Sequence, residues 1–151
     1  MTIRCIVVGT DGSENAALAL RWAIDVGLAF DAEIVAVHSM GLLLHPSPGR
    51  TVPSYGHRDE IRKQLEGPWC EPLREAGVRH RAVFLEGNPV SGLLQTAEDV
   101  SAELIVVGGR GHGGFPELRL GSTSHQLLEY SNRPVTVVPR DWSSVPDVPV
   151  P

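Results

Sequence analysis

Three glycines near the C-terminal end of the chain have a spacing that suits the binding of an anion. Gly108, Gly111 and Gly121 form a G-x-x-G-x9-G pattern, and Ser122 follows directly. Glycine lets a ligand approach main-chain N–H groups that a Cβ atom would shield. The pattern runs from an apolar, strand-like segment into the start of a helix, where unpaired N–H groups and the helix dipole both favour negative charge. The segment therefore predicts a site for a phosphate-bearing small molecule.

Hydroxyl side chains follow the last of these glycines, at Ser122, Thr123 and Ser124. A structural interpretation is that they cap the helix, since Thr123 and Gln126 have the spacing of a capping box. A functional interpretation is that the hydroxyl groups donate to phosphate. The two are compatible, because one hydroxyl can cap while another contacts the ligand. Arg110, in the same loop, is the charged residue best placed to reach a phosphate.

An acidic residue occupies the corresponding place after the first strand-like segment, where Gly9, Thr10 and Asp11 follow one another. Asp11 could cap the next helix together with Glu14, although Ser13 could cap it equally well. Alternatively, its carboxylate accepts hydrogen bonds from a ribose or an adenine. Because a carboxylate would repel a triphosphate, this second role places Asp11 near the nucleoside or near a bridging Mg²⁺.

Strand-like and helix-like segments alternate along the whole chain. Five short segments rich in β-branched residues are predicted strands: Ile3–Gly9, Glu33–His38, His80–Leu85, Leu104–Gly108 and Pro134–Pro139. Helical periodicity follows in a stretch with Ala16, Leu20, Ala23 and Gly27 on one face, and in Arg58–Ala76, Pro89–Ser101 and Thr123–Ser131. This alternation predicts an α/β fold with a single doubly wound, five-stranded parallel sheet flanked by helices. A first strand in the middle of that sheet would set its end beside the end of the fourth strand, where ligands of such folds bind.

Glycine and proline predict where these elements are interrupted. Gly67-Pro68 and Pro72 predict a kink or a split in the second helix, which Gly77 closes. The proline- and glycine-rich segment Met40–Gly56 is predicted to be a long loop, and residues 141–151 are predicted to form a proline-rich, extended tail.

Length and composition restrict the class of protein. A chain of 151 residues suits one domain. A net charge of −5 argues against a nucleic-acid-binding face, and no apolar run is long enough to span a membrane. The N-terminal residues lack the pattern of a secretion signal. Cys5 and Cys70 are predicted to be buried free thiols, which fits a reducing cytoplasm.

Several catalytic patterns are missing from the sequence. There is no G-x-x-x-x-G-K-[ST] motif, and the only lysine is Lys63, far from the glycine pattern. The glycine fingerprint of dinucleotide-binding folds does not follow the first strand, and no G-x-S-x-G motif occurs. The histidines form no metal-ligand spacing with acidic residues or cysteines. These features predict neither a catalytic residue nor a metal site of the protein's own.

Several segments together resemble the universal stress protein family. They are the Gly108–Ser122 pattern, the opening Ile-Val-Val-Gly-Thr-Asp-Gly-Ser, Gly87-Asn-Pro-Val, the run Ala102–Gly108 and the closing stretch Ser124–Pro139. The resemblance covers about Ile3 to Arg140. It implies an adenine nucleotide alpha hydrolase-like fold with strand order 3-2-1-4-5, over residues 1–140, and binding of ATP or a related adenine nucleotide, with or without Mg²⁺. It also implies a homodimer formed through Val135–Val138.

The resemblance also implies a role for each site residue. Asp11, with Gly9 and Thr10, would meet the nucleoside. The strand end Val37–His38 would flank adenine, although a structural role for the His38 side chain stays open. Val107 and Gly108 would line the pocket, and the phosphates would be held by Gly111, Gly121, Ser122, Thr123 and Ser124. The sequence departs from the family at Gly67-Pro68 and at the acidic Glu117.

The leading hypothesis is therefore a cytoplasmic, ATP-binding regulator in the stress response, with at most slow hydrolysis of ATP. One alternative is an ATP-hydrolysing or adenylyl-transferring enzyme of a related superfamily. Another is a dimeric interaction module that keeps the fold and binds no nucleotide.

Overall fold

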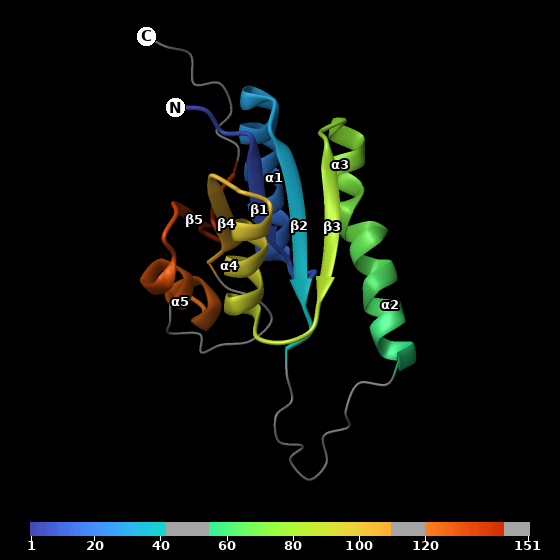
Figure 1. The fold of residues 1–151 in the computed structure, drawn as a ribbon. Helices are drawn as coiled ribbons and strands as arrows, with labels where there is room; N and C mark the ends of the chain where they lie inside the picture. Colours follow the sequence, from blue (N-terminus) through green and yellow to red (C-terminus); the bar gives the residue numbers. More distant parts are fainter. Residues whose placement is uncertain (42–54, 110–119, 144–151) are drawn as a thin grey trace.

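The computed structural model of the chain contains a five-stranded parallel sheet with the order β3-β2-β1-β4-β5, and describes residues 1–41, 55–109 and 120–143 (Figure 1). The strands are β1 (Cys5–Gly9), β2 (Glu33–Ser39), β3 (His80–Leu85), β4 (Leu104–Gly108) and β5 (Val135–Val138). The predicted doubly wound sheet and its strand order are confirmed. The first strand lies in the middle, and Val8 pairs with Val106 of β4, so the two strands end side by side.

Helices cover both faces of this sheet (Figure 1). One face carries α1 (Glu14–Phe30), α2 (Tyr55–Glu66), the short 3₁₀ turn η1 (Pro68–Cys70) and α3 (Glu71–Ala76), and the other carries α4 (Pro89–Asp99) and α5 (Ser122–Tyr130). Alternate strand residues point to opposite faces. Ile6, Val8 and Val106 accordingly join the core under α1, while Val7 and Ile105 join the core under α4 and α5.

The first helix buries the face that its periodicity predicts. Ala16, Leu20, Ala23 and Gly27 are all buried. Gly27 packs so closely on Ile34 of β2 that a Cβ atom would lie 3.2 Å from the Ile34 Cδ1 atom. Small residues on this face therefore let α1 lie close to the sheet.

The predicted split of the second helix is confirmed, and its start is wrong by three residues. The helix begins at Tyr55 instead of Arg58, within the segment predicted as a loop. Helix ends are the least certain part of a sequence-based prediction. The break lies at Gly67-Pro68, and Gly77 ends α3 in the left-handed conformation, with φ of 69°.

Both cysteines are buried free thiols, as predicted. Beyond β5, the main-chain N–H of Trp142 donates to the Pro139 carbonyl, and its ring packs against the core under α1. The rest of the predicted tail, at 144–151, lies outside the described residues, as do 42–54 of the predicted long loop. Among the residues described, no helix has both the length and the apolar character that crossing a membrane requires.

Candidate functional site

The candidate site lies where β1 and β4 end, because their connections leave the sheet on opposite faces. The segment after β1 leads into α1 on one face, and α5 packs on the other. This is the switch point at which ligands of doubly wound sheets bind. Gly9 lies at the base of the site, where a Cβ atom would be 3.1 Å from the Val107 Cγ1 atom and 3.2 Å from Leu93.

The loop after β1 is attached to β2 by its main chain. The N–H of Thr10 donates to the Val37 carbonyl over 2.8 Å, and the Thr10 carbonyl lies 2.8 Å from Nδ1 of His38. Since the partner is a carbonyl, Nδ1 is the donor. The predicted structural role for the His38 side chain is therefore present, and Val37 itself is buried, with its carbonyl occupied.

Asp11 is not the cap of α1. The capping residue is Ser13, whose hydroxyl oxygen accepts from the N–H of Ala16 over 3.2 Å. One Asp11 carboxylate oxygen accepts from the N–H of Ser13 over 2.9 Å, which forms a local turn and orients the side chain. Of the two caps that the sequence leaves open, the structure selects Ser13, and Asp11 lies half-exposed in the loop at the strand end.

Gly108 is enclosed by protein rather than open to a ligand on the side where a Cβ atom would project. A Cβ atom there would lie 2.7 Å from the main-chain oxygen of Asn15 and 2.8 Å from its carbonyl carbon. Glycine at this position therefore lets the first turn of α1 pack against the end of β4. Asn15 is a residue of the site edge that sequence reasoning missed, because nothing local to residue 15 indicates this contact.

Hydrogen bonds among Gly109, Gly121 and Ser124 join the end of β4 to the start of α5, and these three residues are called the neck. The N–H of Gly109 donates to the Val138 carbonyl, and the Gly109 carbonyl accepts from the N–H of Gly121 over 2.6 Å. The Ser124 hydroxyl lies 3.0 Å from the Gly121 carbonyl and 3.3 Å from the Gly109 carbonyl, to both of which it can donate. Ser124 is only 2% exposed. Its side chain therefore belongs to the neck.

The predicted capping box at Thr123 and Gln126 is wrong, because α5 begins one residue earlier than expected. Its N-cap is Gly121, which has no side chain to accept from the first-turn N–H groups. Ser122 is exposed and Thr123 is half-exposed in that first turn. By contrast, α1 is capped by Ser13, and α4 by the Asn88 side chain, which accepts from two N–H groups. The start of α5 is therefore the helix end at this edge for which no side chain among the described residues caps the first-turn amides.

The end of β2 contributes a residue that sequence reasoning missed. The strand extends one residue beyond its predicted end, to Ser39. The Ser39 hydroxyl donates to the Gly87 carbonyl over 2.6 Å, which ties β2 to the loop before α4. Gly111 and Arg110, predicted for the phosphate end, lie outside the described residues.

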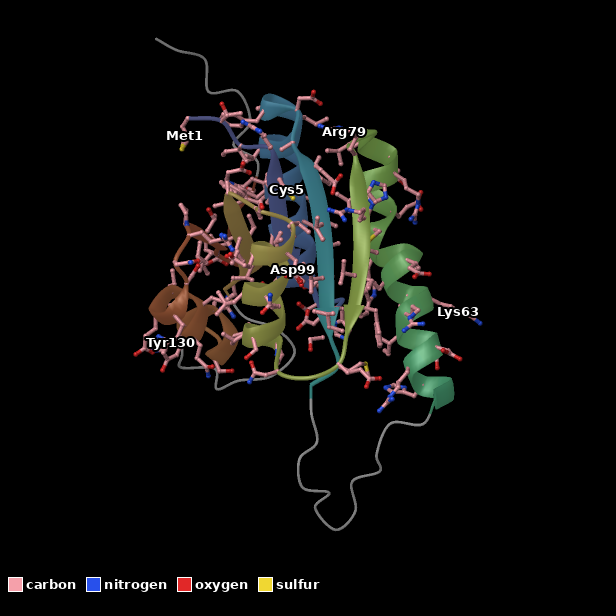
Figure 2. The ribbon with its side chains drawn as sticks, in the orientation of Figure 1. Met1, Cys5, Lys63, Arg79, Asp99 and Tyr130 are labelled. Atoms are coloured by element: carbon pink, nitrogen blue, oxygen red, sulfur yellow. The ribbon has the colours of Figure 1, made fainter. Side chains whose placement is uncertain are left out.

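Cys5 and Glu103 lie at the opposite edge of the sheet, where β1 begins. The side chain of Lys63 projects outward from α2 (Figure 2). Burial raises the pKa of the Cys5 and Cys70 thiols above the ordinary value. Partial burial of Glu103 favours its protonated form, but the N–H groups of Cys5 and Arg4 outweigh this and keep its pKa below the ordinary value. In the described part of the chain, no three His, Cys, Asp or Glu side chains gather as metal ligands would.

Known proteins share this fold and sequence pattern. The universal stress protein family model matches residues 2–139. Universal stress protein MJ0531 of Methanocaldococcus jannaschii is 32% identical over 140 residues, covering 88% of this chain and 80% of that protein. A universal stress protein solved in complex with cAMP is 25% identical, with a TM-score of 0.72 over 93% of this chain and 99% of the other. A universal stress protein from Archaeoglobus fulgidus solved in complex with dAMP is also 25% identical, with a TM-score of 0.68 over 91% and 99% of the two chains.

The fold thus defines a doubly wound α/β protein whose candidate site lies at the switch point of its sheet. The chain belongs to the universal stress protein family.

Proposed function

We propose that this protein binds an adenine nucleotide, ATP in the first place, and acts as a nucleotide-dependent regulator in the stress response of the cytoplasm. The main support is the start of α5, where no side chain of the described residues caps the first-turn amides, at the same edge as Asp11. Open amides and the helix dipole attract phosphate. The cAMP and dAMP complexes of two similar proteins support adenine as the base.

In this proposal the nucleoside lies over the loop between β1 and α1. The Asp11 carboxylate accepts from the ribose hydroxyl groups, and Gly9 and Thr10 line the same side. The end of β2, at Val37 and His38, flanks adenine. Because the Val37 carbonyl is occupied by Thr10, polar contacts to the base come from the main chain further along β2.

The phosphates lie at the start of α5 in this proposal. Gly121 and Ser122 are their principal partners, with Thr123 beside them, and Gly111, which lies outside the described residues, is assigned to the same end of the ligand. Ser124 is assigned to this end as well, while its hydroxyl closes the neck. Val107 and Gly108 form the floor between the two ends of the ligand. Mg²⁺, if bound, would enter with the triphosphate, which supplies oxygen ligands of the kind that Mg²⁺ prefers.

We expect an affinity in the micromolar range. Three or four hydrogen bonds to charged phosphate contribute about 1.5–3 kcal/mol each. Loss of rigid-body freedom costs about 4–15 kcal/mol. Burial of adenine supplies the remainder, and micromolar binding corresponds to about −8 kcal/mol. A regulator that responds to nucleotide levels needs this reversibility, and the described residues include no lysine near α5 to promote rapid phosphoryl transfer.

The test uses Ser122→Glu, because a carboxylate in the first turn of a helix has opposite effects on stability and on phosphate binding. It stabilises the helix end by about 0.3–1 kcal/mol. It also repels phosphate, by about 4 kcal/mol for two unit charges about 4 Å apart near a protein surface. Calorimetric titration should therefore show ATP binding weakened by more than about tenfold, with unchanged adenosine binding and no loss of thermal stability.

Ser122→Ala is the matched control, since it removes the hydroxyl and leaves the amides in place. It should weaken ATP binding only modestly. Unchanged ATP affinity in Ser122→Glu would show that phosphate does not bind at the start of α5. If the wild-type protein binds no adenine nucleotide, the proposed function is wrong.

We also propose that the protein forms a homodimer through β5. This strand is the edge of the sheet, Val135 and Val137 are only partly buried, and Leu128 and Tyr130 of the neighbouring α5 are exposed. An open sheet edge beside apolar side chains can pair with a second copy. Light scattering should give twice the chain mass, and Thr136→Lys should reduce it to that of one chain.

A further inference from the structure

The turn between α2 and α3 presses an aromatic ring against the loop that contains Asp11. Trp69, in η1, lies so close to Gly12 that a Cβ atom on Gly12 would be 2.4 Å from the Cζ2 atom of the indole and 2.5 Å from Cε2. Gly12 has φ of 78°, in the region that favours glycine. The main chain at residue 12 and the indole ring are therefore in direct contact, and only a glycine allows it.

The same indole also contacts the residue that attaches the other end of the loop. The ring centroids of His38 and Trp69 are 5.2 Å apart, at an interplanar angle of 77°, which is the edge-to-face arrangement that aromatic rings prefer. His38 in turn donates to the Thr10 carbonyl. Thr10 is thus fixed by β2, Gly12 is covered by Trp69, and Asp11 lies between these two attachments.

The position of Trp69 is itself fixed by the break in the helices. The Arg74 guanidinium donates to the Glu66 carbonyl over 2.8 Å and to the Gly67 carbonyl over 2.5 Å. The next residue, Cys70, is 1% exposed in the core under α1. Trp69 therefore projects from a turn that is tied to both neighbouring helices, and it forms a stable wall for the loop.

We propose that Trp69 and the imidazole ring of His38 are positioning residues for the nucleoside end of the site. They hold loop 10–12 in one conformation, so that the Asp11 carboxylate faces the ribose before the ligand arrives. Preorganisation of this kind increases affinity by removing the entropic cost of ordering the loop. The inference rests on the proposed nucleotide function and separates two contributions to it. Trp69 affects the binding of the nucleoside, and Ser122 affects the binding of the phosphates.

The first experiment follows the emission of Trp69 in a Trp22→Phe, Trp142→Phe protein, where it is the single tryptophan. Because the loop is ordered before the ligand arrives, adenosine at a concentration that calorimetry shows to be saturating should leave the emission maximum and its quenching by acrylamide unchanged, as should inorganic tripolyphosphate. A shift of the emission along a saturating curve would show that loop 10–12 and Trp69 rearrange on binding, and would overturn the inference. This measurement needs no substitution of Trp69 itself.

The second experiment compares Trp69→Leu with Trp142→Leu, since both side chains are partly buried and pack against the core under α1. Trp69→Leu should weaken the binding of adenosine and of ATP by about tenfold, from the added disorder of the loop, and should leave tripolyphosphate binding unchanged. Trp69→Phe, which keeps an aromatic face, should restore most of the affinity. Trp142→Leu should lower thermal stability without changing any of the three affinities.

A pair of variants at His38 separates the hydrogen bond from the ring contact. His38→Asn can keep a donor for the Thr10 carbonyl, and His38→Phe keeps the ring beside Trp69; each should weaken adenosine binding less than His38→Ala.

Equal weakening of adenosine binding by Trp69→Leu and Trp142→Leu would show that Trp69 acts only as a core residue, and would refute the positioning role. If the wild-type protein binds ATP and Trp69→Leu binds adenosine normally, this inference is refuted and the proposed function is not. A wild-type protein that binds no nucleotide would refute it together with the proposed function.

Discussion

Gly108→Ala tests whether the first glycine of the nucleotide pattern is required by packing in the absence of any ligand. The added Cβ atom would lie 2.7 Å from the main-chain oxygen of Asn15, whereas ordinary van der Waals contacts begin at 3.4 Å. Since the Asn15 oxygen belongs to the main chain and a Cβ atom has a fixed position on its residue, neither can rotate away, and α1 or the end of β4 must move. Overpacking of this kind costs about 1–3 kcal/mol.

For a domain of this size, each kcal/mol lowers the melting temperature by about 2–4 °C, so a decrease of about 2–12 °C is expected. Differential scanning calorimetry on nucleotide-free protein measures it. Gly92→Ala is the matched control, because the Cβ atom would there meet a terminal methyl group of Leu85 at 3.1 Å, which can shift. Alanine also favours a helix over glycine by about 1 kcal/mol, so this variant should melt at or above the wild-type temperature.

Two results would refute the argument. One is a Gly108→Ala protein that melts with the wild type in the absence of nucleotide. The other is a loss of stability that is present only when ATP is bound, since that would make Gly108 a ligand contact rather than a packing requirement.

Three further outcomes are expected. Because burial raises the pKa of the Cys5 and Cys70 thiols, both should react with a thiol reagent at pH 8 only after the protein unfolds, and rapid labelling of native protein would contradict their burial. The depressed pKa of Glu103 stabilises the fold at pH values above 4.5, the ordinary pKa of this carboxyl group. This contribution is lost as the pH falls through the lower folded-state pKa. Urea unfolding should therefore show that the advantage of wild type over Glu103→Gln is present at pH 7 and shrinks below about pH 4.5, whereas an advantage independent of pH would exclude this cause. Asn88→Ala, which removes the cap of α4, should cost about 1 kcal/mol in the same assay, and an unchanged midpoint would show that the cap is dispensable.

The sheet and most helix faces could be predicted because their signals are local. A parallel strand covered on both faces needs a short run of β-branched apolar residues, and the runs at β1 and β4 show this directly. The break at Gly67-Pro68 is equally local, since proline cannot continue a helix hydrogen-bond pattern. Boundaries were less well predicted at α2 and α5, where helices begin three residues and one residue before the expected positions.

The details of the site depend on contacts between distant parts of the chain. Residues around Asp11 offer two possible caps for α1, and packing selects Ser13 while Asp11 forms a turn with it. From the sequence alone, the Ser124 hydroxyl could donate either to a phosphate or to the main chain of the protein. In the structure it is buried at the neck, where the Gly109 and Gly121 carbonyl oxygens are its acceptors.

The sequence by itself determined the α/β class, the nucleotide pattern that ends at Ser122, and the acidic loop after the first strand. These follow from backbone preferences and from periodicities that a few consecutive residues express. Only the tertiary structure decided that Gly108 must accommodate Asn15 and that Trp69 covers Gly12, because each contact joins residues from different elements. Such contacts exist once helices pack on the sheet, and close packing, which tolerates no misplaced atom, fixes which residues must be glycine.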